Sequence, residues 1–296
     1  MDEVRIGLIW PDRSHADRFS GLCNLPGGNT HGDRVEGARV VGLWGEDADR
    51  NRSLSESFGI QLVADRKEDL IGQIDLAVVM SRDGAMHLEL ARPFLEAGVA
   101  TFVDKPLANS LQDALAISEL ARKHGAPMTS FSTYRTATSV QQIKNDQLQS
   151  LAGFTFGEFT GPGQLENEYG GLIFYGIHAA ELALEFMGPG AERVRCSTHG
   201  GNTSATVTWR DDRSATVNVL GNASYVFHVS LYGPDGHHSV VPDATRLYPD
   251  GLAIAVEMAR SRKEPLEHDA FIESIALVEA MNASLRSGNT EPIPSF

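Results

Sequence analysis

Short, almost uninterrupted apolar runs alternate with helical patterns through the first half of this 296-residue chain. Such runs are typical of parallel strands that helices cover on both faces, and their alternation with helices indicates a doubly wound sheet. Helices are expected over 83–97, where Pro93 should kink or split the helix, and over 110–124. The expected strands are Val4–Ile9, Arg39–Leu43, Leu76–Met80, Ala100–Val103 and Met128–Ser130.

After Gly125 the pattern changes to strands in which apolar and polar residues alternate, as in a sheet with one buried face. The polar pair Asp211-Asp212 predicts a tight hairpin. The expected elements are strands at Phe154–Phe159, Arg193–Thr198, Ser204–Trp209, Ser214–Leu220, Tyr225–Leu231 and Ser239–Val241, and helices at His178–Met187, Leu252–Arg260 and Ala270–Leu285. We therefore predict an α/β protein. A Rossmann domain with a doubly wound parallel sheet should occupy residues 1–125, and an α+β domain with a mostly antiparallel open sheet should occupy 126–296, for substrate binding and oligomerisation.

Composition and charge exclude several classes of partner. The chain has 25 basic and 39 acidic residues, and its formal charge of −14 repels nucleic-acid backbones and anionic membranes. Cys23 and Cys196 are the only cysteines and lie far apart, which argues against a disulfide framework and a zinc–thiolate site, so no metal is expected. Without a signal-peptide pattern or a membrane-length apolar stretch, we expect a cytoplasmic protein.

The turn after the first strand is where a Rossmann fold binds the pyrophosphate of its cofactor, through the backbone of Gly-x-Gly-x-x-Gly. Here the chain reads Gly7-Leu8-Ile9-Trp10-Pro11-Asp12-Arg13-Ser14-His15, and the later glycines are missing. The segment Asp12, Arg13, Ser14 and His15 could still hold the cofactor's phosphate. Alternatively, Asp12 or Ser14 merely caps the next helix.

The end of the second strand normally carries an acidic residue that binds the cofactor's ribose diol. That position is Gly45, and Glu46 and Asp47 follow one and two residues later. A carboxylate here, with Glu46 the better candidate, would repel a 2′-phosphate and favour NAD over NADP. The alternative is a solvated turn.

Asp104-Lys105-Pro106 follows the strand Ala100–Val103, at the edge of the sheet where open α/β folds bind ligands. Proline holds the preceding lysine extended, in a cis or a trans bond, and directs its ammonium toward the crevice. There it could polarise a hydroxyl or carbonyl oxygen. The alternative is a surface ion pair.

His178 lies at the expected start of a helix, after the Gly170-Gly171 loop. The dipole at a helix N-terminus favours the neutral imidazole, which a general base needs. A purely structural histidine is the alternative. Tyr134 and Arg135, which follow the last strand of the first domain, are expected either to contact substrate or to pack at a domain hinge.

Together these motifs resemble the Gfo/Idh/MocA family, named for glucose–fructose oxidoreductase, inositol dehydrogenase and a rhizopine catabolism protein. Asp104-Lys105-Pro106 is similar to the family's Glu-Lys-Pro motif, and Gly170–Gly188 is similar to its Gly-Gly-x-x-x-Asp-x-Gly-x-His-x-x-Asp pattern with one spacing slip. The resemblance implies that Lys105 and His178 are catalytic and that both contact the substrate. It also implies cofactor contacts for Asp104 and Pro106 and substrate contacts for Tyr175 and Glu181.

Three departures from the family pattern affect the expected reaction. The glycine turn is replaced, the ribose acid is displaced, and Phe174 stands where the family has the aspartate four residues before its histidine. The resemblance implies NAD as cofactor and a sugar, cyclitol or related polyol or keto-sugar as substrate. Because Trp10 and Pro11 stand where glycines would let the backbone approach the phosphate, we expect NAD to bind weakly, and NADP to be less favoured because of Glu46.

Two other functions stay open. The lost glycines favour a non-redox lyase, hydratase or epimerase, whereas a catalytically silent sugar- or nucleotide-binding protein would not need Lys105 and His178. We also expect a homodimer or homotetramer, because one face of the open sheet must find a cover.

Overall fold

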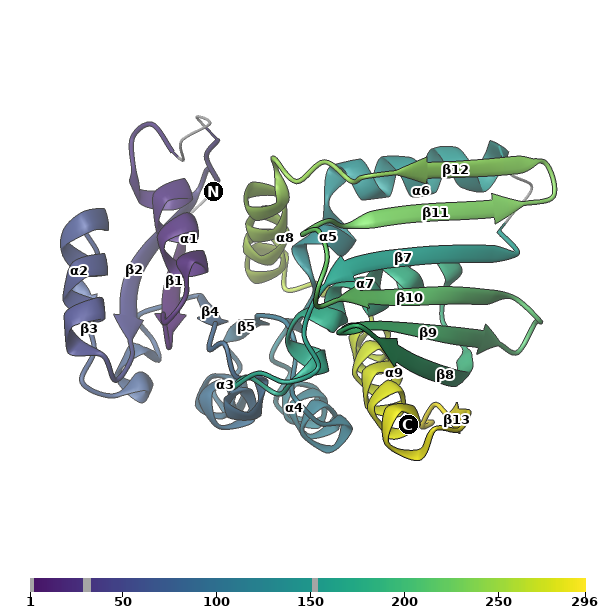
Figure 1. Cartoon of the computed structure of the whole chain (residues 1–296). Helices are drawn as coiled ribbons and strands as arrows, with labels where there is room; N and C mark the ends of the chain where they lie inside the picture. Colours follow the sequence, from purple (N-terminus) through teal and green to yellow (C-terminus); the bar gives the residue numbers. More distant parts are fainter. Residues whose placement is uncertain (1–2, 29–32, 151–153) are drawn as a thin grey trace. The chain divides into compact units, whose positions relative to one another are not determined.

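The computed structural model describes residues 3–28, 33–150 and 154–296, which form two compact units. The first unit comprises Met1–Ala108, Gln112–Phe131 and Arg246–His268, and the second comprises Asn109–Leu111, Ser132–Thr245 and Asp269–Phe296. Helix α8 (Leu247–Ser261) therefore belongs to the first unit, although it follows the strands of the second in sequence (Figure 1). Its Leu252, Ala255 and Val256 are part of the hydrophobic core of that unit.

The first unit is built on a six-stranded parallel sheet with strand order β3-β2-β1-β4-β5-β6. This is the strand order of a Rossmann dinucleotide-binding fold, so the predicted fold class is confirmed. The strands are β1 (Val4–Ile9), β2 (Ala38–Trp44), β3 (Leu62–Val63), β4 (Leu76–Val79), β5 (Ala100–Val103) and β6 (Met128–Thr129). The sequence did not predict β3, because two residues are too short to form a recognisable apolar run.

The remaining helices of the Rossmann sheet are α1 (Ser14–Asn24), α2 (Ala48–Phe58), η1 (Lys67–Leu70), η2 (Gly84–Met86), α3 (His87–Glu96) and α4 (Leu111–His124). The helix predicted over 83–97 is indeed divided. The division falls between η2 and α3, whereas Pro93 lies inside α3.

The second unit is built on a seven-stranded sheet with strand order β12-β11-β7-β10-β9-β8-β13. Only β7 and β10 pair in parallel, so the predicted, mostly antiparallel sheet is confirmed. The strands are β7 (Phe156–Pro162), β8 (Ala191–His199), β9 (Asn202–Trp209), β10 (Ser214–Leu220), β11 (His228–Gly233), β12 (Gly236–Val240) and β13 (Glu291–Pro292). The predicted hairpin joins β9 to β10, with Asp212 in the left-handed region at φ 65°.

The helices of the second unit are α5 (Thr133–Thr136), α6 (Thr138–Ser150), α7 (Leu172–Met187) and α9 (His268–Ser287). Helix α7 packs against β7 and β10 and lies behind the sheet in the view of Figure 1. It begins directly after Gly171, whose φ of 71° favours glycine, and not at His178 as the sequence predicted. His178 therefore lies beyond the first turn of α7. The prediction that the dipole at the helix N-terminus favours its neutral imidazole is wrong.

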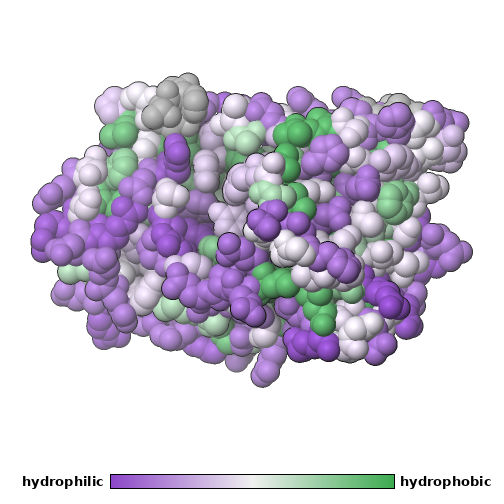
Figure 2. Space-filling view, in the orientation of Figure 1, coloured by the Kyte–Doolittle hydropathy of each residue, from purple (hydrophilic) through white to green (hydrophobic). Residues whose placement is uncertain are grey.

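Polar side chains predominate on the face that Figure 2 shows. Of the helices in the described part of the chain, none combines the length and the apolar character that crossing a bilayer requires. Among the exposed large hydrophobic residues, Tyr225 stands out because 70% of its surface is accessible.

Candidate functional site

A buried carboxylate at the end of β5 organises the part of the site in the first unit. Asp104 is 2% exposed and accepts a hydrogen bond from the Arg13 guanidinium, and its Oδ2 lies 2.7 Å from Nδ1 of His15. Burial by itself would raise the pKa of Asp104, but the charges of His15 and Arg13 hold that pKa well below its usual range. Three residues predicted to contact the cofactor are therefore bound to one another.

The turn after β1 has a glycine-like conformation without a glycine. Trp10 has a φ of 59°, in the left-handed region that bulky residues rarely adopt. Its backbone N–H donates to the Trp44 carbonyl at 2.7 Å, and the two indole rings lie 5.7 Å apart. Residues held in such conformations often cluster at ligand sites, so this turn is a candidate for one.

The first turn of α1 carries no side-chain cap. Its N-cap residue is Arg13, in extended conformation, and the Arg13 side chain makes no capping hydrogen bond. The alternative in which Asp12 or Ser14 is the N-cap residue is therefore wrong. Asp12 instead accepts from the Arg82 N–H at 3.4 Å, and burial raises the pKa of its carboxyl. Backbone N–H groups at an uncapped helix start are suited to binding a phosphate group.

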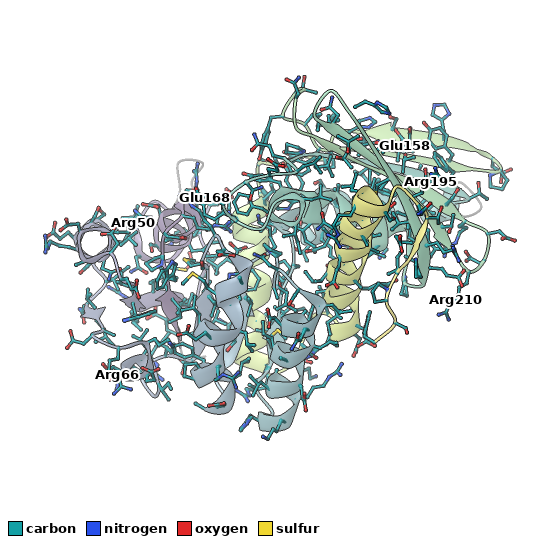
Figure 3. The ribbon with its side chains drawn as sticks, turned by 60° about the horizontal axis from the view of Figure 1, so that its bottom comes forward. Arg50, Arg66, Glu158, Glu168, Arg195 and Arg210 are labelled. Atoms are coloured by element: carbon teal, nitrogen blue, oxygen red, sulfur yellow. The ribbon has the colours of Figure 1, made fainter. Side chains whose placement is uncertain are left out.

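A cavity of about 290 Å³ adjoins this turn. Its lining residues are Trp10, Pro11, Asp12, Gly45, Glu46, Asp47, Arg50 and Asn51. Asp47 accepts from the N–H groups of Asp49 and Arg50 and so caps α2, whereas Glu46 and Asp12 are exposed acids at the cavity. Arg50, labelled in Figure 3, joins α2 to the turn through the Pro11 carbonyl at 3.0 Å.

Asn51 is a candidate ligand that the sequence analysis missed. It is 5% exposed, and its Nδ2 donates to the Gly45 carbonyl at 2.7 Å. Asn51 lines the same cavity, and its Oδ1 is buried without a hydrogen-bond partner among the described residues. Such an acceptor is costly to leave unsatisfied, and a ligand hydroxyl would satisfy it. The only signal in the sequence was a polar residue one turn into the helix after the second strand.

Gly45 occupies the expected place of the ribose acid for a steric reason. A Cβ at this position would lie 2.9 Å from Cδ of Pro11 and 3.1 Å from Oδ1 of Asn51. Any side chain would therefore collide with the turn, and the acidic residue is displaced to Glu46.

Lys105 follows Asp104 and is joined to Pro106 by a cis peptide bond. The lysine is 4% exposed, which does not fit a surface ion pair. His87, which the sequence analysis missed, holds this segment. Its Nδ1 lies 2.9 Å from the Pro106 carbonyl oxygen and its Nε2 lies 3.0 Å from that of Ser81. Burial lowers the pKa of His87.

The part of the site in the second unit is centred on His178, which is 7% exposed. Its Nδ1 lies 2.6 Å from Oγ of Ser132, a partner that the sequence analysis missed. Its ring centroid lies 6.1 Å from that of Tyr134, 5.6 Å from that of Tyr175 and 5.4 Å from that of Phe227. Both tyrosines predicted to bind substrate thus lie against the imidazole.

Glu181 and Arg135 are bound within the second unit. Glu181 accepts from the Ser132 N–H at 2.9 Å and so fixes the residue that contacts His178. Arg135 is 4% exposed, and it donates to Glu185 at 2.9 Å and to the Ala270 carbonyl at 2.9 Å. These contacts favour packing over substrate contact for Arg135.

No group of three or more His, Cys, Asp or Glu side chains that could hold a metal ion occurs in residues 3–28, 33–150 and 154–296.

Residues 24–131 match the family model described as "Oxidoreductase family, NAD-binding Rossmann fold". Inositol 2-dehydrogenase 3 of Saccharopolyspora erythraea is 36% identical over 123 residues, which are 41% of this chain and 33% of that protein. The chain thus matches about a third of the length of this curated relative. Among solved structures, the myo-inositol dehydrogenase of Lactobacillus casei in complex with NAD(H) and myo-inositol has a TM-score of 0.84 at 15% identity, covering 99% of this chain and 98% of that one. The myo-inositol 2-dehydrogenase of Lactobacillus plantarum has a TM-score of 0.83 at 16% identity, covering 99% and 100%.

Proposed function

We propose that this chain, whose residues 24–131 match the NAD-binding Rossmann model of the Gfo/Idh/MocA oxidoreductases, is a member of that family and an NAD-dependent dehydrogenase of a sugar, cyclitol or related polyol. The relatives named as inositol dehydrogenases support this class of substrate. One observation favours the redox reaction over a lyase or an epimerase: the start of α1, where the N-cap residue makes no side-chain cap, follows a turn that lines a cavity together with Asn51, whose Oδ1 is unsatisfied among the described residues.

These residues fit the adenosine half of a dinucleotide. The first-turn amides of α1 would receive the pyrophosphate, and Asn51 Oδ1 and the Glu46 carboxylate would accept from ribose hydroxyls. The charge of Glu46 would repel a 2′-phosphate, which favours NAD over NADP. Pro11 supplies no amide, and Trp10 is bulky in the turn where glycines usually let the backbone approach the phosphate, so we propose weak binding. Overpacking costs about 1–3 kcal/mol, and about 1.4 kcal/mol corresponds to tenfold in affinity.

Two side chains would act on the substrate. The Lys105 ammonium would donate a hydrogen bond to the reacting hydroxyl oxygen, and His178 Nε2 would take the hydroxyl proton. For this, Nδ1 of His178 must carry a proton and donate it to Ser132 Oγ, which leaves Nε2 as the acceptor. Bound NAD supplies the hydride acceptor. The free thiols of Cys23 and Cys196 are compatible with a reducing compartment, and we propose the cytoplasm.

Calorimetric titration of the full chain with NAD, NADH and NADP tests the cofactor. We expect NAD to bind more tightly than NADP by about tenfold, and Glu46→Gln to narrow that difference because it removes the repelling charge. Glu56→Gln removes an exposed acid on α2 that does not line this cavity, and it is the matched control. If neither NAD nor NADH binds at millimolar concentration with a polyol present, the non-redox alternative replaces the dehydrogenase.

Turnover with myo-inositol and NAD, followed as NADH formation, tests the catalytic pair. Lys105→Met and His178→Ala should each abolish turnover while circular dichroism shows a folded protein. Full activity in either variant would contradict the assignment.

A further inference from the structure

A second cavity, of about 630 Å³, lies in the sheet domain and is lined in part by α7, the helix that carries His178. Its volume is in the range of cavities that bind organic ligands. Tyr175 lines this cavity and also contacts the imidazole, because its ring centroid lies 5.6 Å from that of His178. The cavity therefore adjoins the proposed general base.

Four aromatic side chains line this cavity and are called here the aromatic wall: Tyr169, Phe174, Tyr175 and Tyr225. They form a continuous series of ring contacts. The centroids of Tyr169 and Phe174 lie 4.8 Å apart, those of Phe174 and Tyr175 lie 5.1 Å apart, and those of Tyr175 and Tyr225 lie 6.3 Å apart. Tyr225 is 70% exposed, so a ligand can reach its ring.

The charge at the cavity is negative. Glu168, labelled in Figure 3, is the only residue with a charged side chain among the described residues that line it, and none of them is Lys, Arg or His. The chain as a whole carries −14. An anionic substituent would find no basic partner here, whereas a cation would meet ring faces and a carboxylate.

We propose that the aromatic wall and Glu168 bind a positively charged amino group, so that the protein prefers an amino sugar or amino-cyclitol to its neutral parent. The ammonium lies over the ring faces of the wall, where the quadrupole of each ring attracts it, and Glu168 adds a carboxylate. The claim that this ligand is also the substrate of the dehydrogenase rests on the proposed function. A cation–π contact of this kind corresponds to about tenfold in affinity.

Calorimetric and saturation-transfer NMR titrations of the full chain, without nicotinamide cofactor, test this with D-glucosamine, D-glucose and N-acetyl-D-glucosamine. We expect glucosamine to bind about tenfold more tightly than the other two, because acetylation removes the charge and keeps the nitrogen. Tyr225→Leu and Glu168→Gln should reduce this preference, whereas Tyr225→Phe, which keeps the ring, should retain it. Tyr232→Leu, an exposed tyrosine on β11 outside the cavity, is the control.

Equal binding of glucose and glucosamine, or an unchanged preference in folded Tyr225→Leu, would overturn the proposal and would indicate a platform for neutral sugar rings. Because no NAD is present, failure of the dehydrogenase proposal leaves this result intact. Conversely, loss of the amino preference leaves the NAD titrations unaffected, so the two failures are distinguishable.

Discussion

His15 Nδ1 and Asp104 Oδ2 lie 2.7 Å apart although the two residues are 89 positions apart in the chain. Arg13 donates to the same carboxylate oxygen, so the start of α1 and the end of β5 are joined by one buried charge cluster. Lys105, the proposed catalytic lysine, follows directly and donates its N–H to Asp104 Oδ1 at 2.9 Å. The cluster therefore holds the start of α1, where we propose that the cofactor phosphate binds, and the backbone of Lys105, which we propose contacts the substrate.

Removing the charge of Asp104 should destabilise the protein in a pH-dependent way. At pH 7, Asp104→Asn should lower the free energy of unfolding by about 3–5 kcal/mol, because Arg13 stays buried without its partner. The folded-state pKa of Asp104 is depressed, so its contribution is present above the ordinary aspartate pKa of about 3.9 and is lost as the pH falls toward the folded-state pKa. Denaturant unfolding should therefore show the difference from wild type shrinking below about pH 4.

The exposed Asp49→Asn is the control, with an expected change within about 0.5 kcal/mol. A constant difference between wild type and Asp104→Asn from pH 7 to pH 3.5 would contradict the assigned linkage.

Ser132→Ala should impair turnover by disorienting the imidazole of His178. The hydroxyl contact at 2.6 Å fixes the ring, and misplacing a catalytic group by about 1 Å costs on the order of 10²-fold in rate. We expect kcat to fall, KM to change little, and the pH profile of kcat/KM to shift. Ser132→Thr, which keeps a hydroxyl, should restore most of the activity, whereas an unchanged pH profile in Ser132→Ala would indicate a purely structural contact.

Both cysteines should resist thiol reagents in the native protein. Burial raises the pKa of Cys23 and of Cys196 to about 12, so little thiolate exists at pH 8. Titration with a chromogenic disulfide should give no fast reaction until denaturant is added, and then two thiols. A thiol that reacts within seconds in the native protein would show that its burial is transient.

The outward face of the sheet in the second unit should form a homo-oligomer interface. Thr206 and Thr216 are paired on β9 and β10 and alternate with buried apolar residues, so they lie on the face of the sheet that we expect a second copy to cover. Light scattering should therefore give a dimer or tetramer, and Thr216→Arg should shift it toward monomer because a charge would be buried. A wild-type mass of 32.0 kDa at micromolar concentration would refute this.

Local sequence pattern was sufficient to predict several strands to the residue. Val4–Ile9, Ala100–Val103 and Ser214–Leu220 have the predicted bounds, because each is an apolar or alternating run that ends at polar residues. The candidate residues of the Asp104-Lys105-Pro106 motif were likewise evident, since a motif after a parallel strand must lie at the carboxyl edge of the sheet.

Tertiary structure alone decided what those residues contact. Asp104 pairs with His15 and Ser132 contacts His178, and each contact joins segments distant in sequence. The burial of Asn51 Oδ1 likewise depends on how the chain packs around it. The sequence likewise did not show that α8 packs into the core of the first unit. Apolar periodicity reports which face of an element is buried, but it does not report which other element covers that face. Buried polar groups find their partners only when the chain returns and excludes water, so these partners depend on the folded arrangement.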